Sequence, residues 1–142
     1  MIVLDTNVLS DTMRPLPNPA LIAWLNRQDI QTLYITAVSL AELRFGIARL
    51  DDGRKKTDLT ERLDLMLDQV FERRILPFTA AAAQVFADRM AAARRNGSAV
   101  GFQDGMIAAC VAASGFSIAT RDTSPFDAMG IAVTNPWAGP VG

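Results

Sequence analysis

Histidine is absent from this 142-residue sequence, and cysteine occurs once, at Cys110. Without histidine there can be no Ser-His-Asp or Cys-His catalysis, no imidazole acid–base catalysis and no His-ligated metal site. A single cysteine excludes an internal disulfide and Cys-cluster zinc or iron–sulfur sites, and it is compatible with a reducing cytoplasm. An enzyme made from the remaining residue types would rely on carboxylates and hard cations.

Long apolar segments are also absent. The longest uncharged run, residues 105–120, is interrupted by Ser and Gly and is shorter than the ~20 apolar residues of a membrane-spanning helix. The first residues contain no basic region and reach an acid at Asp5, unlike a signal peptide. A net charge of −1 argues against binding nucleic acid through an overall basic surface. We therefore expect a soluble, cytoplasmic protein with no membrane segment.

Half of the residues are hydrophobic and 20% are charged, which is typical of one compact domain over residues 1–142. The apolar pattern predicts strands at residues 2–4, 33–36, 74–78, 117–120 and 131–134. It predicts helices over about 19–25, 39–50, 59–71, 80–96 and 102–114. Because helical segments separate the strands, we predict an α/β fold with three layers, in which helices cover both faces of a parallel sheet of four to five strands.

Two of the predicted helices carry a recognisable sequence pattern. Ser39 and Glu42 have the spacing of a capping box, which opens a helix. An apolar stripe follows helical spacing from Leu59 to Phe71. This stripe fits either the ordinary core of the domain or a surface that a partner protein covers.

Four acids are placed where a parallel sheet usually carries its functional crevice, beyond the carboxyl ends of its strands. Asp5 follows the first strand, Asp122 follows the strand at 117–120, and Glu42 and Asp104 lie one turn or less into helices. If these carboxylates meet, each raises the pKa of the others, and a divalent cation removes that conflict. Carboxylate and water ligands suit Mg²⁺, with Mn²⁺ as a possible substitute.

Three of these acids also have a structural explanation. Asp104 complements a helix dipole, Glu42 is the reciprocal partner of Ser39 in the capping box, and Asp122 begins a turn. Asp5 closes a short apolar strand, where few structural roles need an acid. Asp5 is therefore the acid that the sequence ties most closely to function.

Four segments resemble the successive motifs of PIN-domain ribonucleases. They are residues 5–10 (DTNVLS), residues 39–43 (SLAEL) with Gly46, residues 103–109 (QDGMIAA) and residues 119–122 (ATRD). Residues 47–54 and 135–137 are similar to the VapC and FitB group of bacterial toxins. The resemblance extends over nearly the whole chain, with the motifs in the family's order.

The resemblance implies that Asp5, Glu42, Asp104 and Asp122 form a catalytic metal pocket, with Thr6 and Thr120 as hydroxyl neighbours and Ser39 in support. It implies Mg²⁺-dependent cleavage of RNA, a homodimer, and a cognate antitoxin that blocks the pocket in a hetero-oligomeric complex. Basic residues are needed to position the RNA phosphates, although each is equally explained as solvated surface charge. The candidates are Arg44, Arg49, Arg54, Lys55, Lys56 and Arg121.

The chain departs from the family pattern at two places. Many relatives have Asn at the position of Asp122 and Asp at the position of Pro125, just before the phenylalanine that matches Phe126. Gly105 stands where relatives usually carry Ala, which costs about 1 kcal/mol of helix stability with no gain evident from the sequence. The first departure leaves open whether Asp122 is a direct metal ligand.

Two other classes of protein with acids at strand ends need an acid that this sequence lacks. A haloacid-dehalogenase phosphatase needs an acid where Asn7 stands, and a receiver domain needs one where Thr79 follows the third strand. A metal-dependent DNA nuclease stays open, because four acids do not distinguish ribose from deoxyribose. A catalytically inert PIN-like module that binds protein or RNA also stays open, although a complete set of acids argues against it.

Overall fold

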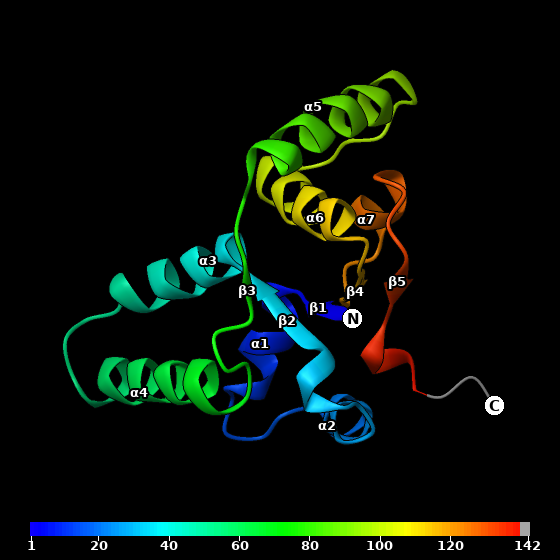
Figure 1. The fold of residues 1–142 in the computed structure, drawn as a ribbon. Coiled ribbons are helices and arrows are strands. Elements are labelled where there is room, and N and C mark those ends of the chain that lie inside the picture. The colour runs from blue at the N-terminus through cyan, green and yellow to red at the C-terminus, as the bar shows by residue number, and fades with distance from the viewer. Residues whose placement is uncertain (140–142) are drawn as a thin grey trace.

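The structure, a computed structural model, describes residues 1–139 and contains a five-stranded sheet in the order β3-β2-β1-β4-β5 (Figure 1). The strands are β1 (Ile2–Leu4), β2 (Leu33–Thr36), β3 (Ile75–Leu76), β4 (Ser117–Ala119) and β5 (Val133–Thr134). Every pairing between neighbouring strands is parallel. The predicted parallel sheet is therefore confirmed.

Helices cover both faces of this sheet, as predicted. They are α1 (Thr6–Thr12), α2 (Pro19–Asn26), α3 (Ala37–Ala48), α4 (Arg54–Gln69), α5 (Ala80–Arg95), α6 (Phe102–Ser114) and α7 (Ser124–Ala128), with short 3₁₀ helices η1 (Ile30–Thr32) and η2 (Pro136–Ala138). In Figure 1, α6 and α7 lie on one side of the sheet, α1, α2 and α4 lie on the other, and α5 packs outside α6. Within residues 1–139, no helix is long and apolar enough to cross a membrane.

The core has two halves because successive strand residues point to opposite faces of the sheet. Val3 and Ile118 pack with residues of α6 and α7, including the fully buried Phe126. Leu4 and Ile35 pack on the other face with residues of α1, α2 and α4. This double burial accounts for the central strand β1, whose three residues Ile2–Leu4 are all apolar, and for the acid Asp5 standing just beyond its end.

The apolar stripe on α4 belongs to this core. Leu63, Leu67 and Phe71 are buried, while Leu59 and Met66 are partly buried against the same cluster. The interpretation of the stripe as ordinary core is thus confirmed. The alternative, a surface that a partner covers, is wrong because these side chains already pack into the core cluster, which includes Leu43 and Ile47 of the neighbouring helix α3.

The start of α3 corrects the capping-box prediction. Thr36 is the N-cap, and its Oγ1 accepts a hydrogen bond from the backbone N–H of Ser39 at 3.0 Å. The N-cap therefore lies three residues earlier than predicted, because the Thr36 hydroxyl at the end of β2 accepts a hydrogen bond from a free N–H of the first helical turn. Ser39 lies inside the helix and is fully buried, so Glu42 has no reciprocal capping role.

Two short helices were not predicted, and three strands are shorter than predicted. β4 ends one residue before the predicted end, at Ala119. α1 begins directly after Asp5, and α7 carries Pro125 in its first turn. β3 covers only Ile75–Leu76, since Pro77 has no N–H to continue the ladder. β5 begins at Val133 rather than at residue 131. The predicted helix boundaries at Asn18, Thr79 and Gly115 are confirmed.

Gly105 has a packing role that the sequence did not reveal. A Cβ atom at Gly105 would lie 2.6 Å from Met90 Sδ and 3.0 Å from Phe86 Cε2, both on α5. These distances are too short for carbon against sulfur or an aromatic ring. The missing side chain therefore lets α5 and α6 approach closely, which offsets the low helix propensity of glycine.

Candidate functional site

A pocket of about 500 Å³ brings together residues from α1, α3, α6 and the segment after β4. Its lining residues are mostly polar or charged. They are Asp5, Thr6, Asn7, Ser10, Asp11, Arg14, Glu42, Asp104, Arg121 and Asp122. All four acids singled out from the sequence thus line one pocket, although as many as 117 positions separate the first from the last in the chain.

Asp5 is the most buried of the four acids and is only 4% exposed. Its Oδ1 accepts the backbone N–H of Thr6, and its Oδ2 accepts the hydroxyl of Thr120, both at 2.8 Å. Burial raises the pKa of Asp5 above its ordinary value, and the charges of Asp104 and Asp122 add to the rise, while the two hydrogen bonds oppose it. Asp5 also caps α1, a structural role that the sequence reasoning had not given it.

Thr120 connects Asp5 and α1 with the segment that follows β4. Its hydroxyl donates to Asp5 and accepts hydrogen bonds from Asn7 Nδ2 at 3.0 Å and from the Asp122 backbone N–H at 3.1 Å. Asn7 Oδ1 in turn accepts the backbone N–H of Arg121 at 3.3 Å. Asn7, which the sequence reasoning did not single out, therefore ties the segment after β4 to α1. Its place in the DTN segment was the available signal.

Glu42 projects from α3 and has a buried Oε1 with no hydrogen-bond partner in the described part of the chain. Burial is the first cause that raises the pKa of Glu42, followed by the nearby charge of Asp5, while the Thr6 side chain lowers it. Ser39 Oγ accepts the hydroxyl of Thr6 at 3.0 Å. Ser39 therefore supports the site by holding Thr6 and not by capping the helix.

Asp104 and Asp122 complete the acidic lining. Asp104 stands in the first turn of α6, and burial followed by the charge of Asp122 raises its pKa. The backbone of Asp122 is held by Thr120, so its position follows from the end of β4. The two acids interact electrostatically although they come from opposite ends of the α6–β4 segment.

The six basic candidates occupy different places. Arg121 lines the acidic pocket, and Arg49 lines a neighbouring groove that shares Glu42. Arg44 pairs with Asp64 at 2.7 Å, on the exposed side of α3 and α4. The other three, Arg54, Lys55 and Lys56, stand in the first turn of α4, and none of them lines the pocket.

The donor set fits a divalent cation. Carboxylate and hydroxyl oxygens line the pocket, one carboxylate oxygen is buried without a partner, and the pKa values of three acids are raised. Among residues 1–139, no three Asp, Glu or Cys side chains lie close enough together to hold a metal ion by themselves. A Mg²⁺ ion at this pocket would therefore bind through one or two carboxylates and keep several water ligands, as Mg²⁺ usually does.

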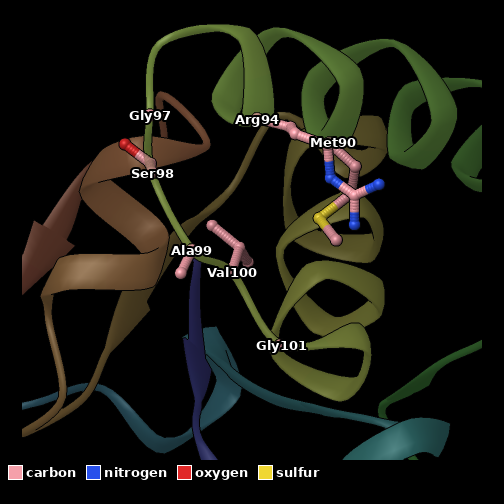
Figure 2. Close-up of a pocket in the computed structure, with 7 residues that line it drawn as sticks. All are labelled: Met90, Arg94, Gly97, Ser98, Ala99, Val100 and Gly101. Atoms are coloured by element: carbon pink, nitrogen blue, oxygen red, sulfur yellow. The ribbon is translucent and has the colours of Figure 1, made fainter.

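Neither a second pocket nor the single cysteine offers chemistry comparable to that of the acidic pocket. A second pocket of about 500 Å³, between α5 and the loop at 97–101, is lined by Met90 and Arg94 and contains no carboxylate (Figure 2). Cys110 is buried in α6, and its burial raises the thiol pKa to about 11, which keeps the sulfur protonated and unreactive at neutral pH. The acidic pocket is therefore the site to which function is assigned.

Comparison with known proteins agrees with the motifs and the fold. Residues 2–132 match the PIN domain family. The chain is 46% identical over 137 residues to VapC ribonuclease Y4jK of Sinorhizobium fredii, covering 96% of this chain and 98% of that protein. It is 42% identical to toxin FitB of Neisseria gonorrhoeae, covering 96% and 99%. The crystal structure of FitAcB from Neisseria gonorrhoeae superposes with a TM-score of 0.91, at 42% identity and 96% and 99% coverage. The chain therefore belongs to the PIN-domain family, in the group that includes VapC ribonuclease and toxin FitB.

Proposed function

We propose that this protein is a Mg²⁺-dependent endoribonuclease and the toxin of a toxin–antitoxin module. The observation that carries the proposal is the convergence of Asp5, Glu42, Asp104 and Asp122 in one pocket. Support comes from the 46% identity to a protein named VapC ribonuclease and the 42% identity to one named toxin FitB. The absence of histidine agrees with this assignment, because hydrolysis assisted by a metal needs no imidazole.

In this proposal the acids bind the metal ion, and two threonines position Asp5. Bound Mg²⁺, or Mn²⁺ in its place, would activate water and stabilise negative charge on the phosphodiester. Asp5, Glu42 and Asp104 would hold the ion directly or through water, and Asp122 would tune it or help to hold a second ion. Thr120 and Thr6 fix both oxygens of Asp5, so this ligand is positioned before any ion arrives.

The first test removes the metal and then its best-positioned ligand. We expect a chelator to abolish RNA cleavage by the purified protein, and added Mg²⁺ or Mn²⁺ to restore it. Asp5→Asn should be nearly inactive yet folded, because Asn caps helices as well as Asp does and keeps an acceptor for the Thr6 N–H. Undiminished cleavage by a folded Asp5→Asn protein would refute the proposed mechanism.

The same assay distinguishes the remaining candidate functions. RNA and DNA oligonucleotides of matched sequence are incubated in parallel with the protein and Mg²⁺. Cleavage of RNA alone supports the ribonuclease, and cleavage of DNA supports the deoxyribonuclease. Binding of RNA without cleavage of either would favour the inert module.

We further propose a cognate antitoxin and a homodimeric toxin within the complex. An acidic pocket with one buried, unpartnered carboxylate oxygen is complementary to a basic side chain, which a protein inhibitor would insert. We expect co-expression with the product of the adjacent small open reading frame to yield a tight complex with low nuclease activity. Failure of the purified pair to associate at micromolar concentration would contradict this.

A further inference from the structure

Two arginines line the acidic pocket, and only Arg121 is among the basic residues that the sequence suggested for positioning RNA phosphates. Arg121 follows β4, and Arg14 follows α1. Within the described residues they are the two basic side chains among the ten that form the lining. The other charged members are all carboxylates, which repel a phosphodiester backbone. An RNA strand therefore meets positive side chains at this pocket only at these two arginines.

Arg14 is held in place by a buried acid. Its Nη1 donates to Asp11 Oδ1 at 2.9 Å, and Asp11 itself is only 5% exposed. Asp11 Oδ2 also accepts the backbone N–H of Asn18 at 3.2 Å. Asp11 is thereby fixed between α1 and α2, and it acts as an anchor for the guanidinium group.

Most of the Arg14 side chain is nevertheless free to bind something else. The side chain is 64% exposed, although the partner carboxylate is 6% exposed. A guanidinium group has five N–H donors in a fixed plane, and one of them is used by Asp11. A planar set of free donors at the wall of a pocket matches the oxygens of a phosphate.

Arg121 is held in a comparable way by a different partner. Its guanidinium carbon lies 5.1 Å from the centre of the Trp137 ring, and its backbone N–H is bound by Asn7. Both arginines are therefore positioned by residues outside the set of proposed metal ligands. Positioning before binding lowers the entropy that a substrate contact costs.

We propose that Arg14, anchored on Asp11, binds one backbone phosphate of the RNA strand and that Arg121 binds another. The strand then crosses the acidic pocket with one phosphate at each arginine and the cleaved linkage at the carboxylates. This inference rests on the proposed ribonuclease function and names the residue that holds the substrate there. Arg14 is a positioning residue and takes no part in the chemical step.

The test measures how RNA binding depends on salt. A fluorescein-labelled 12-nucleotide single-stranded RNA of mixed sequence is titrated with Asp5→Asn protein, which we expect not to cut it, at several KCl concentrations in the presence of a chelator. Each phosphate contact to a single strand contributes about 0.7 to the slope of log affinity against log salt. We expect Arg14→Gln to lower this slope by about 0.7, while Arg14→Lys keeps it.

Arg27→Gln is the matched control, because Arg27 is an exposed arginine at the C-cap of the neighbouring helix α2 and does not line the pocket. It should leave the slope unchanged. In the cleavage-competent protein, Arg14→Gln should raise KM for RNA several-fold with little change in kcat. A purely structural role for Arg14 would lower the melting temperature instead and leave the salt slope as it was, which would overturn the proposal.

A second measurement does not depend on the folding of any Arg14 variant. A series of the same RNA, each member with one neutral methylphosphonate linkage, is bound to the Asp5→Asn protein. We expect loss of affinity at two separate linkages, one assigned to each arginine, and a single sensitive linkage would overturn the proposal. Unchanged RNA binding by Arg14→Gln together with weaker antitoxin binding would overturn it in favour of a protein contact. If the wild-type protein does not cleave RNA, the proposed function fails instead.

Discussion

At the scale of single residues, Glu42 is the side chain whose role changed most between sequence and structure. The sequence offered a capping box with Ser39 as its structural explanation, and the observed cap at Thr36 removes that explanation. What remains is a carboxylate turned into the pocket with a buried oxygen that nothing in residues 1–139 hydrogen-bonds. A buried acceptor without a partner costs stability, so a ligand for it is the physically reasonable purpose.

Glu42→Gln tests this directly, because the change keeps the size of the side chain and removes its charge. We expect stability without metal to be unchanged or higher, since a carboxylate that repels Asp5 is gone. Cleavage and stabilisation by Mg²⁺ should both be lost. Glu61→Gln on the exposed face of α4 is the matched control and should change neither property. Full activity in Glu42→Gln would remove Glu42 from the site.

The raised pKa of Asp104 leads to a prediction about how the stability of the protein depends on pH. Because its pKa in the folded protein is raised above the ordinary value of 3.8, the native state binds this proton more tightly than the unfolded chain does. The resulting stabilisation is complete below the ordinary pKa and disappears as pH rises through the raised value. Above it, ionised Asp104 destabilises the metal-free protein.

The measurement compares urea denaturation of the wild type and Asp104→Asn in chelator. We expect the variant to become progressively more stable relative to the wild type as pH increases from about 4 towards neutrality, since Asn carries no charge. Added Mg²⁺ should reverse the order at neutral pH, because only the wild type gains a ligand. A stability difference that is constant over this range would contradict the electrostatic account of the pocket.

The four acids predicted from the sequence line one pocket because each stands at a place that the fold class itself defines, the carboxyl end of a strand or the first turns of a helix. Sequence reasoning did not find Asn7, Asp11 or Arg14. These residues reach the pocket through α1 and the turn after it, and the helix itself was not predicted. A residue on an unpredicted element has no predicted direction, so its side chain could not be assigned to the site.

At the scale of elements, length decided which parts of the fold the sequence could predict. α4, α5 and α6 are each long enough for an apolar periodicity to show, and all three were predicted. α1 and α7 have seven and five residues, about two turns or fewer, so periodicity carries little information there. Their end signals were present, as Asp5 before α1 and Pro125 in the first turn of α7.

The contact of α5 with α6 leads to a prediction about Gly105. Gly105→Ala should gain about 1 kcal/mol of helix propensity, but its Cβ would meet Met90 and Phe86 at short distances. Overpacking of this kind costs typically 1–3 kcal/mol, so we expect a net destabilisation of about 1 kcal/mol in urea denaturation. Met90→Ala should reduce that cost in the double variant, which a double-mutant cycle measures. A Gly105→Ala protein more stable than the wild type would show that α5 moves aside.

At the scale of the whole molecule, the pocket exists only in the folded chain. Its proposed ligands come from the ends of β1 and β4 and from α3 and α6, so neither half of the sequence contains the site. The central position of β1, between β2 and β4, puts Asp5 in the middle and the other acids around it. The fold thus brings several carboxylates close together, and their repulsion lowers the stability of the native state. A cation that binds only the native state would offset this loss.

Mg²⁺ should therefore stabilise the entire protein. A ligand that binds the native state alone adds about 2.7 kcal/mol at a free concentration of 100 times its dissociation constant. We expect the melting temperature to rise by several degrees and to keep rising with the logarithm of Mg²⁺ concentration. The rise should be absent in Asp5→Asn and intact in Asp88→Asn, an exposed acid on α5 that is outside the pocket. Equal rises in both variants would mean that Mg²⁺ acts through general charge screening, and the metal pocket would lose its thermodynamic support.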